Sequence, residues 1–148
     1  MPDTPETDGA PIILLAFDYG KRRIGVAVGQ QVTGSASPVG TADNTASGPD
    51  WRVIDRWVGE WLPGLLVVGM PWRADGTPSP MTEEARSFAE SLSRYKLPVA
   101  EVDERYSSVE ATEQLRAARA EGRRGRIRKE SIDAAAAVLI AERWLAQN

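Results

Sequence analysis

The stretch IILLAFDYGKRRIGVAV, residues 12–28, sets the architecture of this chain. Residues 12–17 are a continuous apolar run, which is typical of a strand buried on both faces of a sheet. Residues 24–28 form a second apolar run, and only six residues separate the two. A connection this short allows an antiparallel hairpin but no crossover to a parallel neighbour. The stretch therefore predicts two adjacent antiparallel strands, and Asp18 stands at the end of the first.

The remaining pattern predicts an α/β fold. A third, weaker strand is expected within residues 36–41, followed by a polar loop at 42–49. Further strands are expected at 65–68 and 98–102, and helices at 51–61, from Ser79-Pro80 onward, at 107–118 and at 132–146. Strands that alternate with helices join a sheet in parallel. The prediction is a five-stranded mixed sheet, three antiparallel strands then two parallel, flanked by helices.

The chain of 148 residues is expected to form one domain over residues 11–148, with a disordered N-terminal tail over residues 1–10. It has no Cys and no His, which excludes the usual zinc sites, Cys nucleophiles and His-based triads. Any metal would be held by oxygen ligands, which favours Mg²⁺ or Mn²⁺. The longest apolar run is too short to span a bilayer, and residues 1–10 do not resemble a signal peptide. We expect a cytoplasmic protein with no membrane partner.

Basic residues gather near the C-terminus of an otherwise acidic chain. The net charge is −3, yet residues 111–148 hold 8 basic and 5 acidic side chains, whereas residues 1–110 hold 10 and 16. A patch this dense can meet phosphates even on an acidic protein, although a solvated loop gives the same pattern. The patch consists of Arg116, Arg119, Arg123, Arg124, Arg126, Arg128 and Lys129.

Two carboxylates occupy the ends of predicted strands. Asp18 closes a strand that is otherwise wholly apolar, where a charge is costly unless it is paired or bound to a metal. Glu104 follows the strand at 98–102, and ligands gather at such strand ends in α/β sheets. Simpler interpretations stay open: Asp18 can accept backbone N–H bonds in the turn, and Glu104 can pair with Arg105 on the surface.

A third carboxylate, Asp133, lies on the core-facing stripe of the last predicted helix, together with Ala137, Ile140 and Trp144. An unpaired acid on a buried helix face costs several kcal/mol, so a compensating group is expected. Lys129 is four residues earlier and shares this face if the helix extends back that far. The alternative is an Asp that interacts with the helix dipole.

Together, the three acids can converge on divalent cations. Two metal ions about 4 Å apart activate a water and stabilise the leaving oxygen in phosphodiester hydrolysis, and they need no His or Cys. The residues therefore predict a metal-dependent phosphodiesterase with Asp18, Glu104 and Asp133 as ligands. Candidates for contact with backbone phosphates are Lys21, Arg22, Arg23, Arg123, Arg124, Arg126 and Lys129.

Four motifs resemble the YqgF family, also called RuvX. They are FDYGKRRIG at 17–25, VVGMP at 67–71 with Asp75-Gly76, VDER at 102–105, and Lys129 with DAAA at 133–136. The resemblance implies an RNase H-like fold and a Mg²⁺- or Mn²⁺-dependent nuclease, with acids at the positions of Asp18, Glu104 and Asp133. It also implies processing of the 5′ end of precursor 16S ribosomal RNA. The fourth acid of RuvC-type sites has no clear counterpart, because Asp103 would point to the opposite sheet face.

Three functions are weighed on these grounds. The first is a nuclease acting on precursor ribosomal RNA or the pre-ribosomal small subunit, as a monomer or homodimer. The second keeps the chemistry but takes branched DNA, as a Holliday-junction resolvase, which normally works as a two-fold dimer. The third is a non-catalytic nucleic-acid- or ribosome-binding module. Trp72 is a further candidate: it either stacks on a base or anchors its loop.

Overall fold

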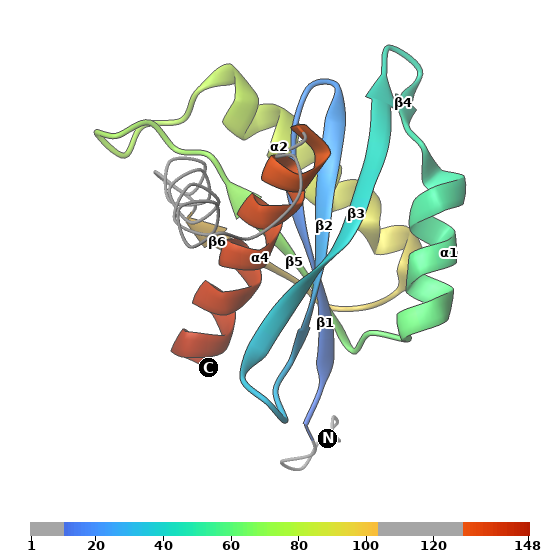
Figure 1. Ribbon diagram of the computed structural model, residues 1–148. Coiled ribbons are helices and arrows are strands. Elements are labelled where there is room, and N and C mark those ends of the chain that lie inside the picture. Colours follow the sequence, from blue (N-terminus) through green and yellow to red (C-terminus); the bar gives the residue numbers. More distant parts are fainter. Residues whose placement is uncertain (1–10, 104–128) are drawn as a thin grey trace, which may run out of the picture.

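The computed structural model describes residues 11–103 and 129–148, with the side chains of the second range given from Ala134 onward. Its centre is a six-stranded mixed sheet in the order β4-β3-β2-β1-β5-β6. Helices cover both faces of this sheet (Figure 1). The strands are β1 (Ile13–Tyr19), β2 (Arg23–Gln30), β3 (Ser35–Thr45), β4 (Gly48–Pro49), β5 (Leu65–Met70) and β6 (Val99–Asp103).

The predicted hairpin is confirmed. β1 and β2 pair antiparallel with Ile13 opposite Gln30 and Tyr19 opposite Ile24. Gly20 opens the turn between them, and a Cβ at this position would lie 2.5 Å from the carbonyl oxygen of Arg23. A side chain cannot occupy that space, so the tight turn requires glycine here.

The prediction of a loop at 42–49 is wrong. β3 continues through Thr45, and Gly48–Pro49 forms the additional short strand β4, which pairs with Asn44 and Thr45. Asp, Asn, Ser and Gly favour turns, which is why the segment reads as a loop. The extension is held by tertiary contacts instead, because the backbone N–H of Asn44 donates to the carbonyl of Arg22 across the sheet at 2.8 Å.

The parallel half of the sheet follows the prediction. β5 pairs with β1 in parallel, with Phe17 beside Val68, and β6 pairs with β5 in parallel, with Asp103 beside Met70. All six residues of β5 are buried, as expected for a strand covered on both faces. β1, β5 and β6 therefore all end at the same edge of the sheet.

Helices α1 (Trp51–Trp61) and α2 (Pro80–Ser91) cover one face. The bounds of α1 agree with the prediction, and Ser79 caps α2 as expected. A 3-10 turn, η1 (Leu92–Tyr95), follows α2. Phe17 and Val26 from the sheet pack against Ile54 of α1 and Phe88 of α2 in the larger core. Because strand side chains alternate between faces, the odd-numbered residues of β1 point to this side.

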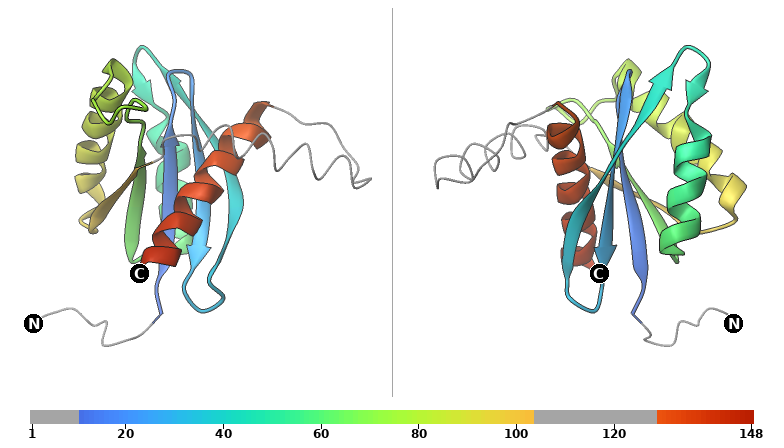
Figure 2. Two further views of the ribbon diagram at one scale, coloured as in Figure 1. Left: turned by 90° about the vertical axis from the view of Figure 1, so that its left-hand side faces the viewer. Right: turned by 45° about the vertical axis from the view of Figure 1, so that its right-hand side comes forward.

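Helix α4 (Lys129–Gln147) covers the opposite face, where Ile140 and Ala141 pack on Leu14, Ala16 and Val67 (Figure 2). It begins three residues earlier than predicted, so Lys129 does belong to it. The helix predicted at 107–118 lies outside the described residues. Within the described ranges, no helix is long and apolar enough to span a membrane.

Small residues line the contact between α4 and the sheet. Gly25, Ala27 and Gly29 of β2 lie opposite Asp18, Ala16 and Leu14, so alternation places them on the α4 face. A Cβ on Gly29 would lie 3.3 Å from a methyl carbon of Leu145 in α4. On the helix, Ala137 and Ala141 are fully buried, and Ala134 is nearly so. The helix therefore approaches the sheet closely.

Ala137→Leu should destabilise the protein by about 1–3 kcal/mol, because Ala137 is fully buried and three added carbons must displace packed atoms. Urea denaturation followed by circular dichroism measures the change. Ala146→Leu is the matched control, since Ala146 is exposed on the same helix and should change stability by less than about 0.5 kcal/mol. Equal stability of the two variants would contradict the close packing of α4.

Candidate active site

Asp18 lies on the face of the sheet that α4 covers. It is half-buried and is the last residue but one of β1. Leu14 and Ala16, which precede it by four and two residues, pack in the core beneath α4. Strand alternation therefore directs Asp18 to the same side. The carboxylate lies where this core meets the carboxyl edge of the sheet.

Glycines border Asp18 on both neighbouring strands. Gly25 of β2 is its direct partner. On the other side, Phe17 pairs with Val68 of β5, so Gly69, the next residue of β5, lies beside Asp18. Neither residue has a side chain that would cover the carboxylate. Both glycines are buried, so a Leu or Val at either position would add bulk next to this carboxylate.

The end of β6 lies at the same edge. Val102 packs in the core under α4, so alternation turns Asp103 to the other face, as predicted from the sequence. The main-chain carbonyl of Asp103 accepts a hydrogen bond of 2.9 Å from the Arg143 guanidinium of α4, which ties the strand end to the helix. Glu104 comes next in the chain and lies outside the described residues.

The start of α4 lies at the end of the sheet where β1 stops, and the helix runs back from there (Figures 1 and 2). Asp133 and Lys129 are both in its first turns, four residues apart. Ala137 and Ile140, which share the predicted stripe with Asp133, are fully buried, and Trp144 packs on the same core. The predicted stripe therefore faces the sheet.

Among the residues whose side chains the structure describes, no group of three Asp, Glu, His or Cys lies close enough to hold a metal ion. Only Asp18 of the three predicted ligands belongs to that set. The triad of Asp18, Glu104 and Asp133 therefore stays a prediction. The structure does place the strand of Asp18, the strand leading to Glu104 and the helix of Asp133 around one edge.

Basic side chains flank this edge at the β1–β2 turn. Lys21 and Arg22 are exposed, whereas Arg23 is half-buried at the start of β2, opposite Asp43 of β3. The side chains of Lys21 and Arg22, which are predicted to contact phosphates, are thus accessible to a ligand. Arg123, Arg124 and Arg126 lie outside the described residues.

Asn44 holds that turn in place, and sequence reasoning missed it. The residue is 6% exposed, and its side-chain amide donates a 2.7 Å hydrogen bond to the carbonyl of Gly20. With the backbone bond from Asn44 to Arg22, two residues of the turn are fixed from β3. Buried polar groups need such partners. The only signal in the sequence was an Asn in a polar segment, which does not distinguish an anchor from a loop residue.

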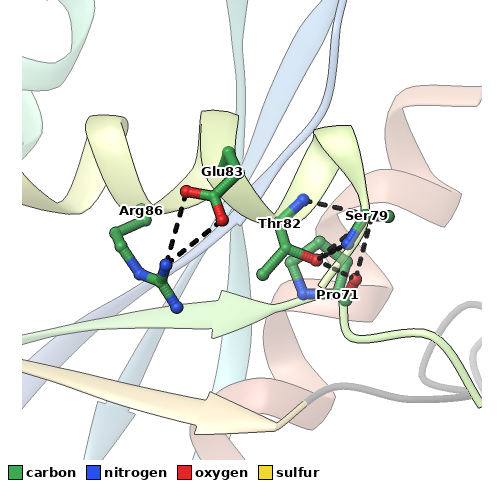
Figure 3. A network of polar contacts seen from close by, with 5 residues as sticks. All are labelled: Pro71, Ser79, Thr82, Glu83 and Arg86. Atoms are coloured by element: carbon green, nitrogen blue, oxygen red, sulfur yellow. Dashed lines mark hydrogen bonds and ion pairs between the residues drawn. The ribbon is translucent and has the colours of Figure 1, made fainter. Parts of the chain in front are cut away.

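A second anchor holds the loop that follows β5 (Figure 3). Thr82 of α2 is fully buried. Its hydroxyl donates a hydrogen bond of 2.7 Å to the carbonyl of Pro71, and it accepts one of 2.9 Å from the backbone N–H of Ser79. Ser79 caps the helix by accepting from the backbone N–H of Thr82. The sequence predicted the cap at Ser79 but not the role of Thr82. Both ends of the 71–79 loop are therefore fixed to α2.

Within this loop, Trp72 is an anchor. Its ring packs partly buried against the larger core, and the Arg86 guanidinium lies 5.6 Å from the ring centroid. Glu83 holds that guanidinium with an ion pair of 3.3 Å. Asp75 forms the predicted turn, and its hydrogen bonds from the side chain and backbone of Thr77 lower the pKa of its carboxyl. Of the two interpretations of Trp72, the loop anchor is the one observed.

Comparison with solved structures defines the class of protein. The fold is similar to that of T. thermophilus RuvC in complex with a Holliday junction substrate, with a TM-score of 0.50 at 13% sequence identity, over 88% of this chain and 90% of that chain. At this identity the likeness concerns the fold alone. The class is the RNase H-like α/β fold of RuvC-type resolvases, with six strands in place of the five predicted.

The chain belongs to the RuvX family, because the family model “RuvX: Holliday junction resolvase” matches residues 12–147. A Xanthomonas oryzae relative named “Putative pre-16S rRNA nuclease” is 48% identical over 134 residues, which cover 90% of this chain and 86% of the relative. A relative with the same name from Pseudomonas putida is 44% identical over 137 residues, covering 92% and 96%. The resemblance seen in the motifs is thereby confirmed.

Thr82→Val should destabilise the protein by about 1–3 kcal/mol, because the Pro71 carbonyl loses its donor and the Ser79 N–H loses its acceptor. Urea denaturation measures the difference. Thr82→Ser keeps the hydroxyl and is the matched comparison, so it should lose less stability than Thr82→Val. If Val is tolerated as well as Thr, the hydroxyl does not anchor the loop.

Proposed function

We propose that this protein is a metal-dependent nuclease that hydrolyses phosphodiester bonds in structured nucleic acid, and that it processes the 5′ end of precursor 16S ribosomal RNA. One observation carries the proposal. Asp18 lies beneath α4 at the carboxyl edge, between Gly25 and Gly69, which have no side chains to cover it. An acid at the carboxyl ends of parallel strands lies where ligands gather in α/β sheets, which suits a cation ligand.

The proposed ligands are Asp18, Glu104 and Asp133. If β6 continued extended by one residue, Glu104 would share the face of Val102, which is the face of Asp18. Asp133 is in the helix that packs on this face. The set supplies only carboxylate oxygens, which suit Mg²⁺ or Mn²⁺. When bound, such ions activate a water and stabilise the leaving oxygen of a phosphodiester.

The side chains of the protein have distinct tasks in this mechanism. The three carboxylates hold the cations and fix the position of the reacting phosphate. Lys129, one helical turn before Asp133, offsets carboxylate charge when no cation is present. Lys21 and Arg22 on the anchored turn, with Arg23 beside them, hold neighbouring phosphates. Arg123, Arg124 and Arg126 are the further proposed contacts to phosphates.

The choice of substrate rests on the relatives. Proteins at 44–48% identity are named for pre-16S rRNA, which favours precursor ribosomal RNA or the pre-ribosomal small subunit. Branched DNA is the second candidate, because the matching family model is described as a Holliday junction resolvase. A resolvase requires a two-fold dimer with two sites, whereas the RNA reaction is open to a monomer. A chain that stays monomeric in solution, also when junction DNA is added, would therefore argue against the resolvase.

Asp18→Asn should reduce cleavage of a precursor 16S leader RNA by at least about a thousandfold with Mn²⁺ supplied, because a catalytic cation contributes several kcal/mol. Gel-based cleavage rates measure the effect, and a four-way DNA junction is assayed in parallel. Glu101→Gln is the control: Glu101 is exposed on β6, on the opposite face by alternation, and should keep full activity. Cleavage by Asp18→Asn at the wild-type rate would refute the assignment.

A triple variant with Gln at Arg123, Arg124 and Arg126 should bind RNA more weakly. The slope of the logarithm of its association constant against the logarithm of the salt concentration should be shallower by about 2, because fewer counterions are released. Filter binding with a chelator present measures affinity without cleavage. The double variant Arg52→Gln/Arg56→Gln on α1 is the control, because both residues are exposed on the opposite side of the sheet from α4. An unchanged slope in the triple variant would show that the segment is a plain solvated loop.

A further inference from the structure

A concave site lies on the α1/α2 face, on the other side of the sheet from α4. It has a volume of about 380 Å³, within the range of small-molecule sites, roughly 300–1,000 Å³. Its walls come from the end of β1, the start of α1 and the length of α2, and include Tyr19, Trp51 and Phe88. Nothing in the proposed mechanism uses this cavity.

The cavity contains a set of planar groups. The rings of Trp51 and Phe88 are stacked, with an interplanar angle of 18° and centroids 5.8 Å apart. Tyr19 lies 5.3 Å from Phe88, centroid to centroid. The guanidinium carbon of Arg94 is 3.8 Å from the centroid of Trp51, although Arg94 as a whole is exposed. Phe88 is almost fully buried and Arg94 lies over Trp51, so the plane that remains exposed is the Arg94 guanidinium. Guanidinium planes are among the surfaces on which unpaired bases stack.

The polar groups of the cavity indicate which planar ligand fits. Glu84 of α2 is half-buried in its wall, and within the described residues it makes no hydrogen bond or ion pair. Arg94 lines the same cavity, and the two opposite charges do not pair with each other. A carboxylate in this state is an acceptor for N–H donors. Guanine presents two adjacent donors, N1–H and the N2 amino group, on its Watson–Crick edge.

We infer that this cavity binds an unpaired guanine of the nucleic-acid substrate, stacked on the Trp51–Arg94 surface and hydrogen-bonded to Glu84. The inference rests on the proposed function, because it takes the substrate to be nucleic acid. Tyr19 follows Asp18 directly on β1, and the two point to opposite faces of the same strand end. A strand that crosses this edge therefore reaches both sites, with a phosphate at Asp18 and a nearby base in the cavity.

The test is a titration followed by the indole N–H signal of Trp51 in nitrogen-15 NMR spectra, using the full chain and a chelator. The probes are the pentaribonucleotides UUGUU, UUAUU and UUUUU. UUGUU should shift this signal with an affinity at least about tenfold higher than the other two, because only guanine offers two donors to the carboxylate. Glu84→Gln should reduce the preference to about twofold or less. Glu90→Gln, exposed on the same helix outside the cavity, should keep it.

Several results would overturn the inference. The first is a Trp51 signal that none of the pentanucleotides shifts. The second is an unchanged guanine preference in Glu84→Gln. The third is tighter binding of guanosine monophosphate than of UUGUU, which would indicate a site for a free nucleotide. A lysine-containing peptide that moves the signal when RNA does not would identify a protein-binding site instead. Binding of UUGUU is measured on the wild-type chain with a chelator, so it does not depend on a cation or on cleavage. If Asp18→Asn loses cleavage but the chain does not bind UUGUU, only the cavity proposal fails. If Asp18→Asn cleaves at the wild-type rate and the chain binds UUGUU with guanine preference, only the nuclease assignment fails.

Discussion

The close approach of α4 to the sheet is the constraint on which the rest of the structure depends. The helix can lie near β2 because Gly25, Ala27 and Gly29 face a run of alanines. This contact brings the first turns of α4 to the edge where β1 and β6 end. An aspartate on a buried stripe is costly without compensation. The same small residues that allow the packing therefore bring the part of α4 that carries Lys129 and Asp133 to this edge.

Alternation along β1 divides the molecule into two working faces. Its even-numbered residues lead to Asp18 beneath α4, and its odd-numbered residues lead to Tyr19 beside the cavity of the α1/α2 face. The edge they share is stiffened by two buried side chains, Asn44 on the β1–β2 turn and Thr82 on the loop after β5. Both satisfy backbone groups that would otherwise stay unpaired, so the edge is ordered before any ligand arrives.

Elements governed by local pattern could be predicted from the sequence, and elements governed by distant contacts could not. The apolar runs of β1 and β5 and the spacing in α1 carry their own signal, and each element was placed within two residues. β4 was missed because its residues favour turns and only pairing with Asn44 makes them a strand. Asn44 and Thr82 were missed for a related reason, since a buried anchor is defined by what it touches. Of the predicted ligands, the surroundings of Asp18 agree with its expected place, and the arrangement with Glu104 and Asp133 is the part that stays a prediction.

The distribution of charge explains how an acidic protein can take a polyanion. The three carboxylates proposed as ligands would repel phosphate at this edge until bound cations offset their charge. Asp103 does not add a carboxylate to this face, because alternation turns its side chain away from the face of Val102. Three carboxylates carry less negative charge than two divalent cations carry positive charge. In the proposed site, this excess positive charge would attract a substrate phosphate. Cation loading and substrate binding are therefore expected to reinforce each other at this edge.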